Sequence, residues 1–253
     1  MVSSNPSVSE TVLAVDIGAT TIKFALVNGD GELVDEVLRR PTPYPCSPTR
    51  LVEFVNEEIA ASGCHRVGIG FPGALIEGQV IEPGNLSRTN GFTSPIDPHL
   101  HEQWLNTDLE KAFREASHQD VRVVNDATLL ALGCSSGAGR ELVFSLGTGF
   151  GIALVVDGTV EPIRDVGNEE FTDGRSYDQL LGDYGRSLDA ERWNRLLVRA
   201  VSGFVHEFSA NTVHLGGGNA RHVNRLLFAR LEYRVVVNDY DAPLRGAAKL
   251  FQS

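Results

Sequence analysis

Apolar residues recur along this chain in two patterns. Short runs or alternations predict strands, and longer stretches with helical spacing predict helices. The predicted strands are residues 11–17, 22–28, 32–38, 65–71, 121–124, 142–146, 151–160 (a hairpin), 211–215 and 233–237. The predicted helices are residues 47–61, 101–116, 127–134, 189–208, 221–229 and 244–251. Strands that alternate with helices in this way are typical of α/β proteins.

The two halves of the chain begin alike. Each starts with a strand, a glycine turn that carries threonine, and a hairpin, as in VDIGATT at 15–21 and SLGTGFG at 145–151. This repeated order of elements predicts two related α/β lobes, residues 11–125 and 126–253, after a disordered tail of residues 1–10. We expect the C-terminal helix to pack back on the first lobe.

Composition narrows the class of protein. With 253 residues, 42% of them hydrophobic, the chain can bury two cores or one large one. No apolar run approaches the ~20 residues of a membrane-spanning helix, and the opening MVSSNPSVSE lacks the basic start and apolar core of a signal peptide. Three widely spaced cysteines, Cys46, Cys64 and Cys134, fit free thiols in a reducing compartment. We therefore expect a cytoplasmic protein, and the net charge of −11 argues against nucleic acid or a membrane surface as its partner.

Three glycine turns are candidate phosphate sites. VDIGATT, SLGTGFG and LGGGN (215–219) each follow a strand, and glycine lets backbone N–H groups approach phosphate oxygens closely while threonine hydroxyls add donors. LGGGN also precedes a predicted helix, whose first amides would face an anion. Each turn alone is equally an ordinary strand connection. Their spacing fits neither a Walker loop nor the GxGxxG fingerprint.

The motifs in order, VDIGATT, FPG, WLNTD, VNDA, SLGTGFG, DVGNEE and LGGGN, resemble the ROK family of sugar kinases, and within it the bacterial polyphosphate/ATP glucokinases. The resemblance covers residues 11–250. It implies a two-lobed actin-like ATPase (ribonuclease H-like) fold, with mixed sheets, flanking helices and an inter-lobe cleft. It also implies transfer of a phosphoryl group from ATP, polyphosphate or both to a hydroxyl of a glucose-like hexose, with Mg²⁺ as cofactor.

The resemblance assigns the chemistry to particular acids. Asp126, in VNDA, would be the general base that accepts the proton of the attacking sugar hydroxyl, a need set by the high pKa of alcohols. The alternative is an aspartate that caps the helix beginning at Ala127. Asn125 would hold a sugar hydroxyl. Asp16, at the end of the first strand, would face Mg²⁺ and the phosphates, partly through water.

The resemblance implies two sets of binding residues. The phosphate- and nucleotide-binding set is Asp16, Gly18, Thr20, Thr21, Lys23, Gly147, Thr148, Gly149, Gly216, Gly217 and Gly218. The sugar-binding set is Gly73, Asn85, Asn125, Asp165, Asn168 and Glu170. Asn85 lies in a long polar loop, residues 77–100, where Asn90 is the alternative.

Two departures from the family pattern stand out. DVGNEE replaces the usual ELGHLE, so Asp165 stands for a glutamate and Asn168 for a histidine, and these changes favour another sugar or a weaker activity. No cysteine follows Cys134, so the zinc cluster of many members cannot form. His99 and His101 are interpreted as solvated side chains rather than metal ligands.

A non-catalytic sugar or nucleotide sensor of the same fold is the alternative function. The retained Asp16, Asn125, Asp126 and glycine turns weigh against it. The choice between ATP and polyphosphate stays open, because the 22 lysines and arginines form no obvious basic run of the kind that polyphosphate would favour. Family resemblance alone suggests a homodimer.

Overall fold

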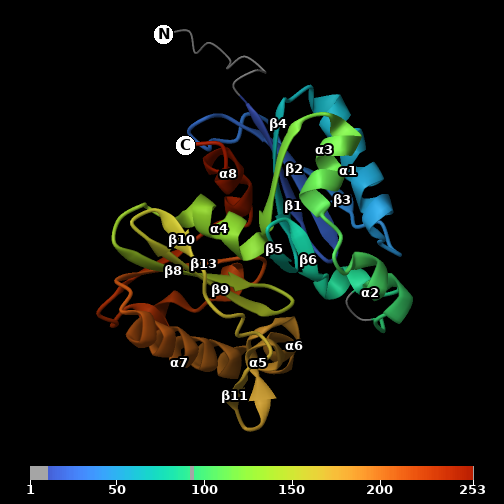
Figure 1. The fold of residues 1–253 in the computed structure, drawn as a ribbon. Helices are drawn as coiled ribbons and strands as arrows, with labels where there is room; N and C mark the ends of the chain where they lie inside the picture. The colour runs from blue at the N-terminus through green and yellow to red at the C-terminus, as the bar shows by residue number, and fades with distance from the viewer. Residues whose placement is uncertain (1–10, 92–93, 253) are drawn as a thin grey trace, which may run out of the picture. The chain divides into compact units, whose positions relative to one another are not determined.

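The computed structural model describes residues 11–91 and 94–252 (Figure 1). The predicted disordered tail, residues 1–10, lies outside these described residues. The chain divides into two compact units. Unit 1 is Met1–Leu129 together with Pro243–Ser253, and unit 2 is Leu130–Ala242.

Unit 1 is built on a five-stranded mixed sheet in the order β3-β2-β1-β4-β7. Its strands are β1 (Val12–Ile17), β2 (Thr21–Val27), β3 (Leu38–Pro41), β4 (Arg66–Phe71) and β7 (Asp120–Asn125). The three strands at one end, β1, β4 and β7, are parallel, whereas β2 runs antiparallel to both β1 and β3. Parallel strands end at the same edge of a sheet, so this topology collects the residues that follow β1, β4 and β7.

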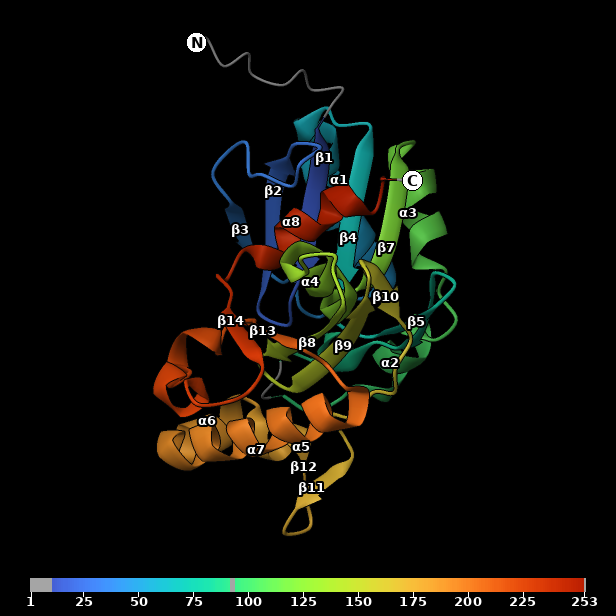
Figure 2. The same ribbon diagram turned by 90° about the vertical axis from the view of Figure 1, so that its left-hand side faces the viewer.

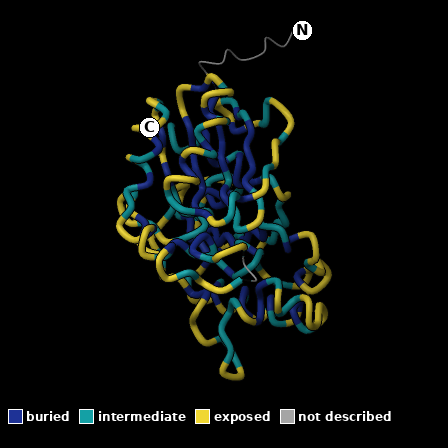
Figure 3. Tube along the Cα trace, turned by 90° about the vertical axis from the view of Figure 1, so that its right-hand side faces the viewer, coloured by how far each residue is buried: buried dark blue, intermediate teal, exposed yellow. Residues whose placement is uncertain are grey.

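Helices cover both faces of this sheet. Helices α1 (Pro48–Ser62) and α3 (Leu109–Ser117) lie on one face, and α8 (Ala242–Lys249) lies on the other (Figure 2). The strands supply alternate residues to the two faces, as period-2 side chains must. In β1, Leu13 and Val15 join the α1 side, whereas Val12 and Ala14 join the α8 side together with Leu129 of α4 (Asp126–Cys134). Buried segments accordingly run along the strands of this unit (Figure 3).

Unit 2 repeats the topology of unit 1. Its sheet has the order β10-β9-β8-β13-β14, again with a three-stranded antiparallel part and three parallel strands. The strands are β8 (Arg140–Leu146), β9 (Phe150–Val156), β10 (Thr159–Glu161), β13 (Thr212–Gly216) and β14 (Arg234–Val237). The same strand order in two units confirms the predicted mixed α/β fold class with flanking helices.

The long helix α7 (Ala190–Phe208) buries its apolar stripe in the core of unit 2. Trp193, Leu197, Val201 and Phe204 are buried along it at helical spacing. Two short helices, α5 (Tyr177–Leu181) and α6 (Asp183–Leu188), and the hairpin of β11 (Glu170–Thr172) and β12 (Arg175–Ser176) precede it. The tip of that hairpin is exposed (Figure 3).

Three predicted elements are wrong. The predicted strand 32–38 is a single bridge between Val27 and Leu33, because the Asn28 side chain accepts the N–H groups of Asp30 and Glu32 and tightens the turn. The predicted helix 101–116 is two helices, α2 (Pro98–Trp104) and α3. The first helix ends where Leu105 turns extended, with a ψ of 132°, Asn106 follows with a left-handed φ of +62°, and the Asp108 carboxylate caps the second helix.

The third error follows the LGGGN turn. The predicted helix 221–229 consists of two short 3₁₀ turns, η3 (Ala220–His222) and η4 (Arg225–Phe228). Asn224 separates them, because its side chain accepts the N–H of Leu226 and its own N–H donates to Asn194. In the loop 77–100, the described residues form more structure than expected: β6 (Gln79–Glu82), which pairs with β5 (Ala74–Ile76), η2 (Gly84–Ser87) and the start of α2.

One polar cluster is buried inside unit 2. The Glu141 carboxylate is fully buried and accepts the N–H groups of Ser136 and Gly137, each at 3.0 Å. The same carboxylate lies 2.7 Å from Nε2 of the buried His214. Elsewhere, no helix in the described ranges is long and apolar enough for a bilayer crossing.

Candidate functional site

The two predicted acids of unit 1 lie at one edge of its sheet. Asp16 in β1 is level with Gly70 in β4, and Gly70 is level with Val124 in β7, two residues before Asp126. Neighbouring strands are ~4.8 Å apart, so the main chains at Asp16 and Val124 are about 10 Å apart. A Cβ added at Gly70 would be 3.6 Å from the Cα of Asp126. The structure therefore brings Asp16 and Asp126 together at the carboxyl ends of the parallel strands.

Glycine at position 70 leaves room for the Leu129 side chain of α4 against the sheet. A Cβ there would lie 2.7 Å from Cδ2 of Leu129, which is closer than real Cβ contacts come. Leu129 belongs to the core on the α8 side of the sheet, the side to which Val12 and Ala14 point. Asp16 continues their alternation and points to the same side. Both acids thus share a face as well as an edge.

Asp16 is held by Lys23, its partner across the β1–β2 ladder. Nζ of Lys23 lies 2.8 Å from Oδ2 of Asp16, and the two side chains are 5% and 14% exposed. Within the residues that the structure describes, the other oxygen, Oδ1, accepts no hydrogen bond from the protein. Lys23, predicted as a phosphate ligand, therefore also neutralises the carboxylate that ends β1.

A magnesium ion held mainly by water and phosphate fits this carboxylate. Magnesium prefers hard oxygen ligands and keeps several waters, so one or two carboxylates suffice. Among the described residues, no group of three histidine, cysteine, aspartate or glutamate side chains could hold a metal. The described residues therefore form no metal site made only of protein ligands. Asp16 is the carboxylate that would hold the ion.

Asn125 and Asp126 share the start of α4. The N–H of Ala127 donates to Oδ1 of Asn125 at 2.8 Å and to Oδ1 of Asp126 at 2.7 Å. Nδ2 of Asn125 donates to the carbonyl of Gly73 at 2.8 Å. Asn125 therefore fastens the Phe71-Pro72-Gly73 turn to the helix start, a role not anticipated from the sequence. Because both side chains accept the same N–H, the helix start does not depend on Asp126 alone.

Two residues not predicted for the site brace the first glycine turn. Thr42 donates from Oγ1 to the carbonyl of Gly18 at 2.7 Å and from its N–H to the carbonyl of Thr20. The hydroxyl of Tyr44 donates to the carbonyl of Ala19 at 2.8 Å. Burial raises the pKa of Tyr44 to about 12, so this hydroxyl remains a donor at neutral pH.

Tyr44 also reaches the predicted sugar loop. Its hydroxyl lies 3.2 Å from the carbonyl of Asn85, in η2, and Nε of Arg88 donates to Oδ1 of Asn85 at 2.8 Å. Since Arg88 occupies the amide oxygen, the amide NH₂ of Asn85 is the group oriented to donate. The alternative residue, Asn90, is exposed, and its backbone N–H bonds to Ser94. Contacts between residues thus connect the first glycine turn to Asn85 within unit 1.

The other two glycine turns meet in unit 2. Nδ2 of Asn219 donates to the carbonyl of Gly147 at 2.9 Å, and its N–H donates to the carbonyl of Leu146 at 2.8 Å. Gly217 has a φ of +84°, and a Cβ there would lie 2.5 Å from the carbonyl oxygen of Leu146. The structure therefore brings together SLGTGFG and LGGGN at the edge where β8 and β13 meet. The expectation of helix-start amides at LGGGN is wrong, because only η3 follows it.

The predicted sugar residues of unit 2 are exposed. Oδ1 of Asp165 accepts the N–H of Gly167 at 3.0 Å, and Oε1 of Glu170 accepts the N–H of Gly174 at 3.2 Å. Asn168 is exposed between them. Each side chain therefore keeps polar atoms that face solvent in this unit.

Asp178 links this segment to the SLGTGFG turn and was not predicted. Its Oδ1 accepts the N–H of Phe150 at 2.7 Å, and its N–H donates to the carbonyl of Gly167. A Cβ at Gly149 or Gly167 would come within 3 Å of this carboxylate, which explains why both neighbours are glycine. Burial raises the pKa of Asp178, and the charge of Asp165 adds to this rise against the hydrogen bond from Phe150.

Comparison with known proteins identifies the family. The model of the ROK family matches residues 12–162, which is more than half of the chain. The chain belongs to the ROK family. This membership confirms the resemblance that the motifs indicated.

Three relatives show how far the likeness extends. A polyphosphate glucokinase of Mycobacterium tuberculosis is 23% identical over 244 residues, which cover 89% of this chain and 87% of the relative. A glucokinase of Thermotoga maritima is 26% identical, covering 92% of this chain and 88% of that protein. The crystal structure of an inorganic polyphosphate/ATP-glucomannokinase from Arthrobacter sp. strain KM is 28% identical, with a TM-score of 0.78 and coverage of 96% and 98%. The fold class of these ROK proteins, the two-lobed actin-like ATPase fold, is confirmed for this chain.

Proposed function

We propose that this ROK protein is a sugar kinase that transfers a phosphoryl group from ATP or polyphosphate to a hydroxyl of a glucose-like hexose, with Asp126 as the general base. It is a phosphotransferase with an alcohol acceptor. The observation that carries the proposal is the shared edge and face of Asp16 and Asp126, with Gly70 level with the first and in contact range of the second. The polyphosphate glucokinase and glucomannokinase among its relatives support the choice of acceptor and donors.

The reaction needs a group that accepts the proton of the sugar hydroxyl and a site that binds the donor phosphates. Asp126 takes the proton of the sugar hydroxyl as the hydroxyl oxygen attacks the terminal phosphorus, and the bond to the bridging oxygen breaks to release ADP or a shortened polyphosphate. Amides of the glycine turns at 18–21, 147–149 and 216–218 bind the donor phosphates. Magnesium, when bound beside Asp16, supplies positive charge for the phosphate oxygens.

The side chains that bind the sugar have hydrogen-bonding positions left over after their bonds within the protein. Asn85 is oriented to donate from its amide, and Asn125 keeps one donor and one acceptor position beyond its bonds to Gly73 and Ala127. Asp165, Asn168 and Glu170 complete the set. The shorter Asp165 and the amide of Asn168 shift the polar contacts from the family pattern, and a buried polar group left unpaired costs about 1–3 kcal/mol. A hexose other than glucose is therefore a preferred candidate in the test below.

The test is a coupled phosphorylation assay across hexoses and amino sugars, with ATP and with polyphosphate as donors. We expect transfer to at least one hexose and a Mg²⁺ requirement. A protein that binds sugar yet phosphorylates none with either donor would instead support the non-catalytic sensor. The homodimer and the cytoplasmic location stay predictions, and the mass of the particle in solution tests the first.

A Tyr44→Phe variant tests the contact between the two loops of unit 1. It removes the donor to Ala19 and Asn85 while keeping the ring that packs on the core. A lost hydrogen bond of about 1 kcal/mol corresponds to a ~5-fold effect, so we expect the KM for sugar and for donor to rise by roughly 3–10-fold. Steady-state kinetics measures both constants.

Ser62→Ala is the control for this prediction. The Ser62 hydroxyl donates to the carbonyl of Ile59 at 2.8 Å at the C-terminal end of α1, which leads into the start of β4, the end of that strand opposite to Gly70. The control should change thermal stability without changing either KM. Equal KM values in Tyr44→Phe and the wild type would show that the two loops do not depend on this hydroxyl.

A further inference from the structure

The segment after the LGGGN turn is basic in an acidic protein. Residues 219–234 hold Arg221, Arg225, Arg230 and Arg234, together with His222, against a single acid, Glu232. The rest of the chain must carry the excess of acid that makes the net charge −11. These arginines are separated by three or four other residues, so they form no run in the sequence. All four are exposed.

The four arginines lack acidic partners in the described part of the chain. None of them forms an ion pair there, whereas Arg164, Arg192 and Arg195 of the same unit each pair with a carboxylate. Nε of Arg221 instead donates to Nε2 of His222 at 3.1 Å, so its partner is a neutral ring nitrogen rather than a carboxylate. We name Arg221, Arg225, Arg230 and Arg234 the basic strip. Guanidinium groups without counter-ions favour a polyanion at this surface.

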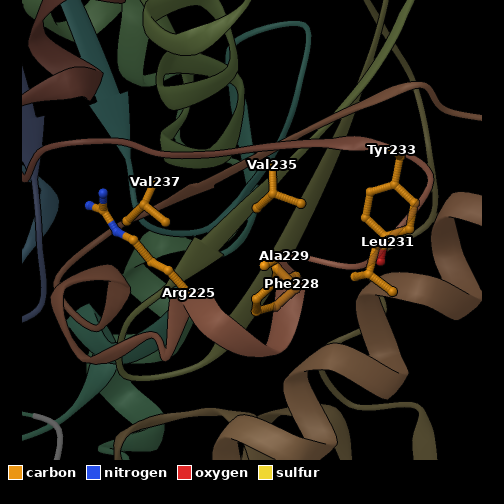
Figure 4. A pocket seen from close by; sticks show the side chains of 7 residues that line it. All are labelled: Arg225, Phe228, Ala229, Leu231, Tyr233, Val235 and Val237. Carbon is orange, nitrogen blue, oxygen red and sulfur yellow. The ribbon is translucent and has the colours of Figure 1, made fainter.

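The basic strip starts at the proposed donor turns. The N–H of His222 donates to the carbonyl of Asn219, whose side chain bonds to Gly147 of the other turn. Farther along, η4 carries Arg225, which lies close to Val237 at the end of β14 (Figure 4). Val237 is level with Leu215, the residue before the LGGGN glycines.

The strip continues along the edge strand of the sheet. Arg225 lines a small pocket of about 270 Å³ with six other side chains, Phe228, Ala229, Leu231, Tyr233, Val235 and Val237 (Figure 4). Arg234 begins β14, so it lies one strand length, about 10 Å, from Val237. Arg225 and Arg234 therefore lie near the two ends of β14, and Arg230 lies between them in the chain, after η4.

We propose that the basic strip binds the chain of an inorganic polyphosphate donor whose terminal phosphates lie in the glycine turns. This inference rests on the proposed function for those turns and names the donor class that the site is built for. A polyphosphate carries a charge on every unit, so a line of guanidinium groups meets successive phosphates, and each group can bind two oxygens at once. ATP ends in adenosine after three phosphates and cannot occupy the outer arginines in that way.

The experiment compares the double variant Arg225→Gln/Arg230→Gln with the control Arg192→Gln/Arg195→Gln. Both remove two positive charges from unit 2, but the control pair lies on α7 and bonds to Asp173 and Glu191. Binding of medium-chain polyphosphate is measured by calorimetry at several salt concentrations, without sugar, and KM is measured for polyphosphate and for ATP. Thermal melts establish that each variant is folded.

We expect the strip variant to weaken polyphosphate binding about 10-fold or more and to raise the ratio of the polyphosphate KM to the ATP KM by a similar factor. The slope of log affinity against log salt should fall by about one for each lost arginine contact. The control should keep the wild-type ratio, and Arg225→Lys/Arg230→Lys should recover part of the binding because it restores the charges.

Three results would overturn the proposal. The first is an equal loss of polyphosphate binding in the strip and control variants, which would show that only the net charge of the protein matters. The second is equal weakening of ATP and polyphosphate by the strip variant. The third is a wild-type protein that phosphorylates sugar with ATP but neither binds nor uses polyphosphate. In that case the proposed sugar kinase activity would still hold. Absence of transfer from both donors would count against the proposed function itself.

Discussion

Asp126→Asn is expected to fold normally and to lose about 10²–10⁴-fold in kcat, the usual share of a general base. Asparagine keeps an oxygen that can accept the N–H of Ala127, and Oδ1 of Asn125 accepts the same N–H. The helix start therefore survives the change. What asparagine cannot do is take a proton from the sugar hydroxyl. Turnover with saturating sugar and donor measures the loss.

The matched control is Asp189→Asn. Asp189 is the N-cap of α7, where its carboxylate accepts the N–H of Arg192 at 2.8 Å. If Asp126 were only a cap, both variants would behave alike, with little change in stability, because asparagine caps a helix about as well as aspartate, and with no loss of turnover. A kcat of Asp126→Asn close to that of the control would remove Asp126 from the mechanism.

Glu141→Leu is expected to cost at least about 3 kcal/mol of unfolding free energy, because each buried hydrogen-bonding group left without a partner costs about 1–3 kcal/mol. The substitution leaves the N–H groups of Ser136 and Gly137 and Nε2 of His214 without their acceptor in the interior of unit 2. These groups lose their water on folding and gain nothing in return. Denaturant unfolding followed by circular dichroism measures the difference.

A surface carboxylate provides the comparison for Glu141. Glu207 pairs with Arg164 at 2.6 Å, but both side chains are more than two-fifths exposed. Glu207→Leu should change stability by no more than about 1 kcal/mol, because water replaces the lost pair. Equal effects at the two positions would mean that the buried cluster contributes no more than a surface ion pair.

The same cluster predicts a dependence of stability on pH. Burial alone would raise the pKa of Glu141, but the bonds from Ser136, His214 and Gly137 outweigh it, and the pKa is lowered. The folded state thus binds fewer protons than the unfolded state between the lowered pKa and the unfolded value of about 4.3. Stability from this group is present above that value and is lost as the pH falls through the folded pKa. Unfolding of Glu141→Gln between pH 3 and 6 should show a flatter pH profile than the wild type.

The sequence predicted the frame of this protein because that frame is coded locally. Alternation of apolar residues gave strands such as β1 and β4, helical spacing gave α7, and the glycine turns marked where strands end. Wherever a single side chain redirected the backbone, the pattern was misleading. The extended Leu105 and the positive φ of Asn106 split one predicted helix, and Asn224 separated the two 3₁₀ turns after LGGGN.

The candidate site was likewise predictable from the sequence only in part. The sequence showed that acids stand at the ends of two strands, Asp16 in β1 and Asp126 after β7. It did not show that the two acids share an edge and a face of the sheet, because that depends on strand order. Tyr44 joins residues 25 and 41 positions away from it, and no local pattern points to such a contact. Asp178 was missed for the same reason, since its partner Phe150 is 28 positions distant.

By itself, then, the order of motifs determined the family, the kind of fold and the acids and glycine turns that its chemistry would use, because each is a short pattern of neighbouring residues. Only the tertiary structure decided which side chains hold those turns in place, that a buried carboxylate and histidine lie in the core of unit 2, and that Arg225 lies beside Val237 of β14. These are contacts between residues far apart in the chain, and their free energy depends on burial and distance, which exist only once the chain has folded.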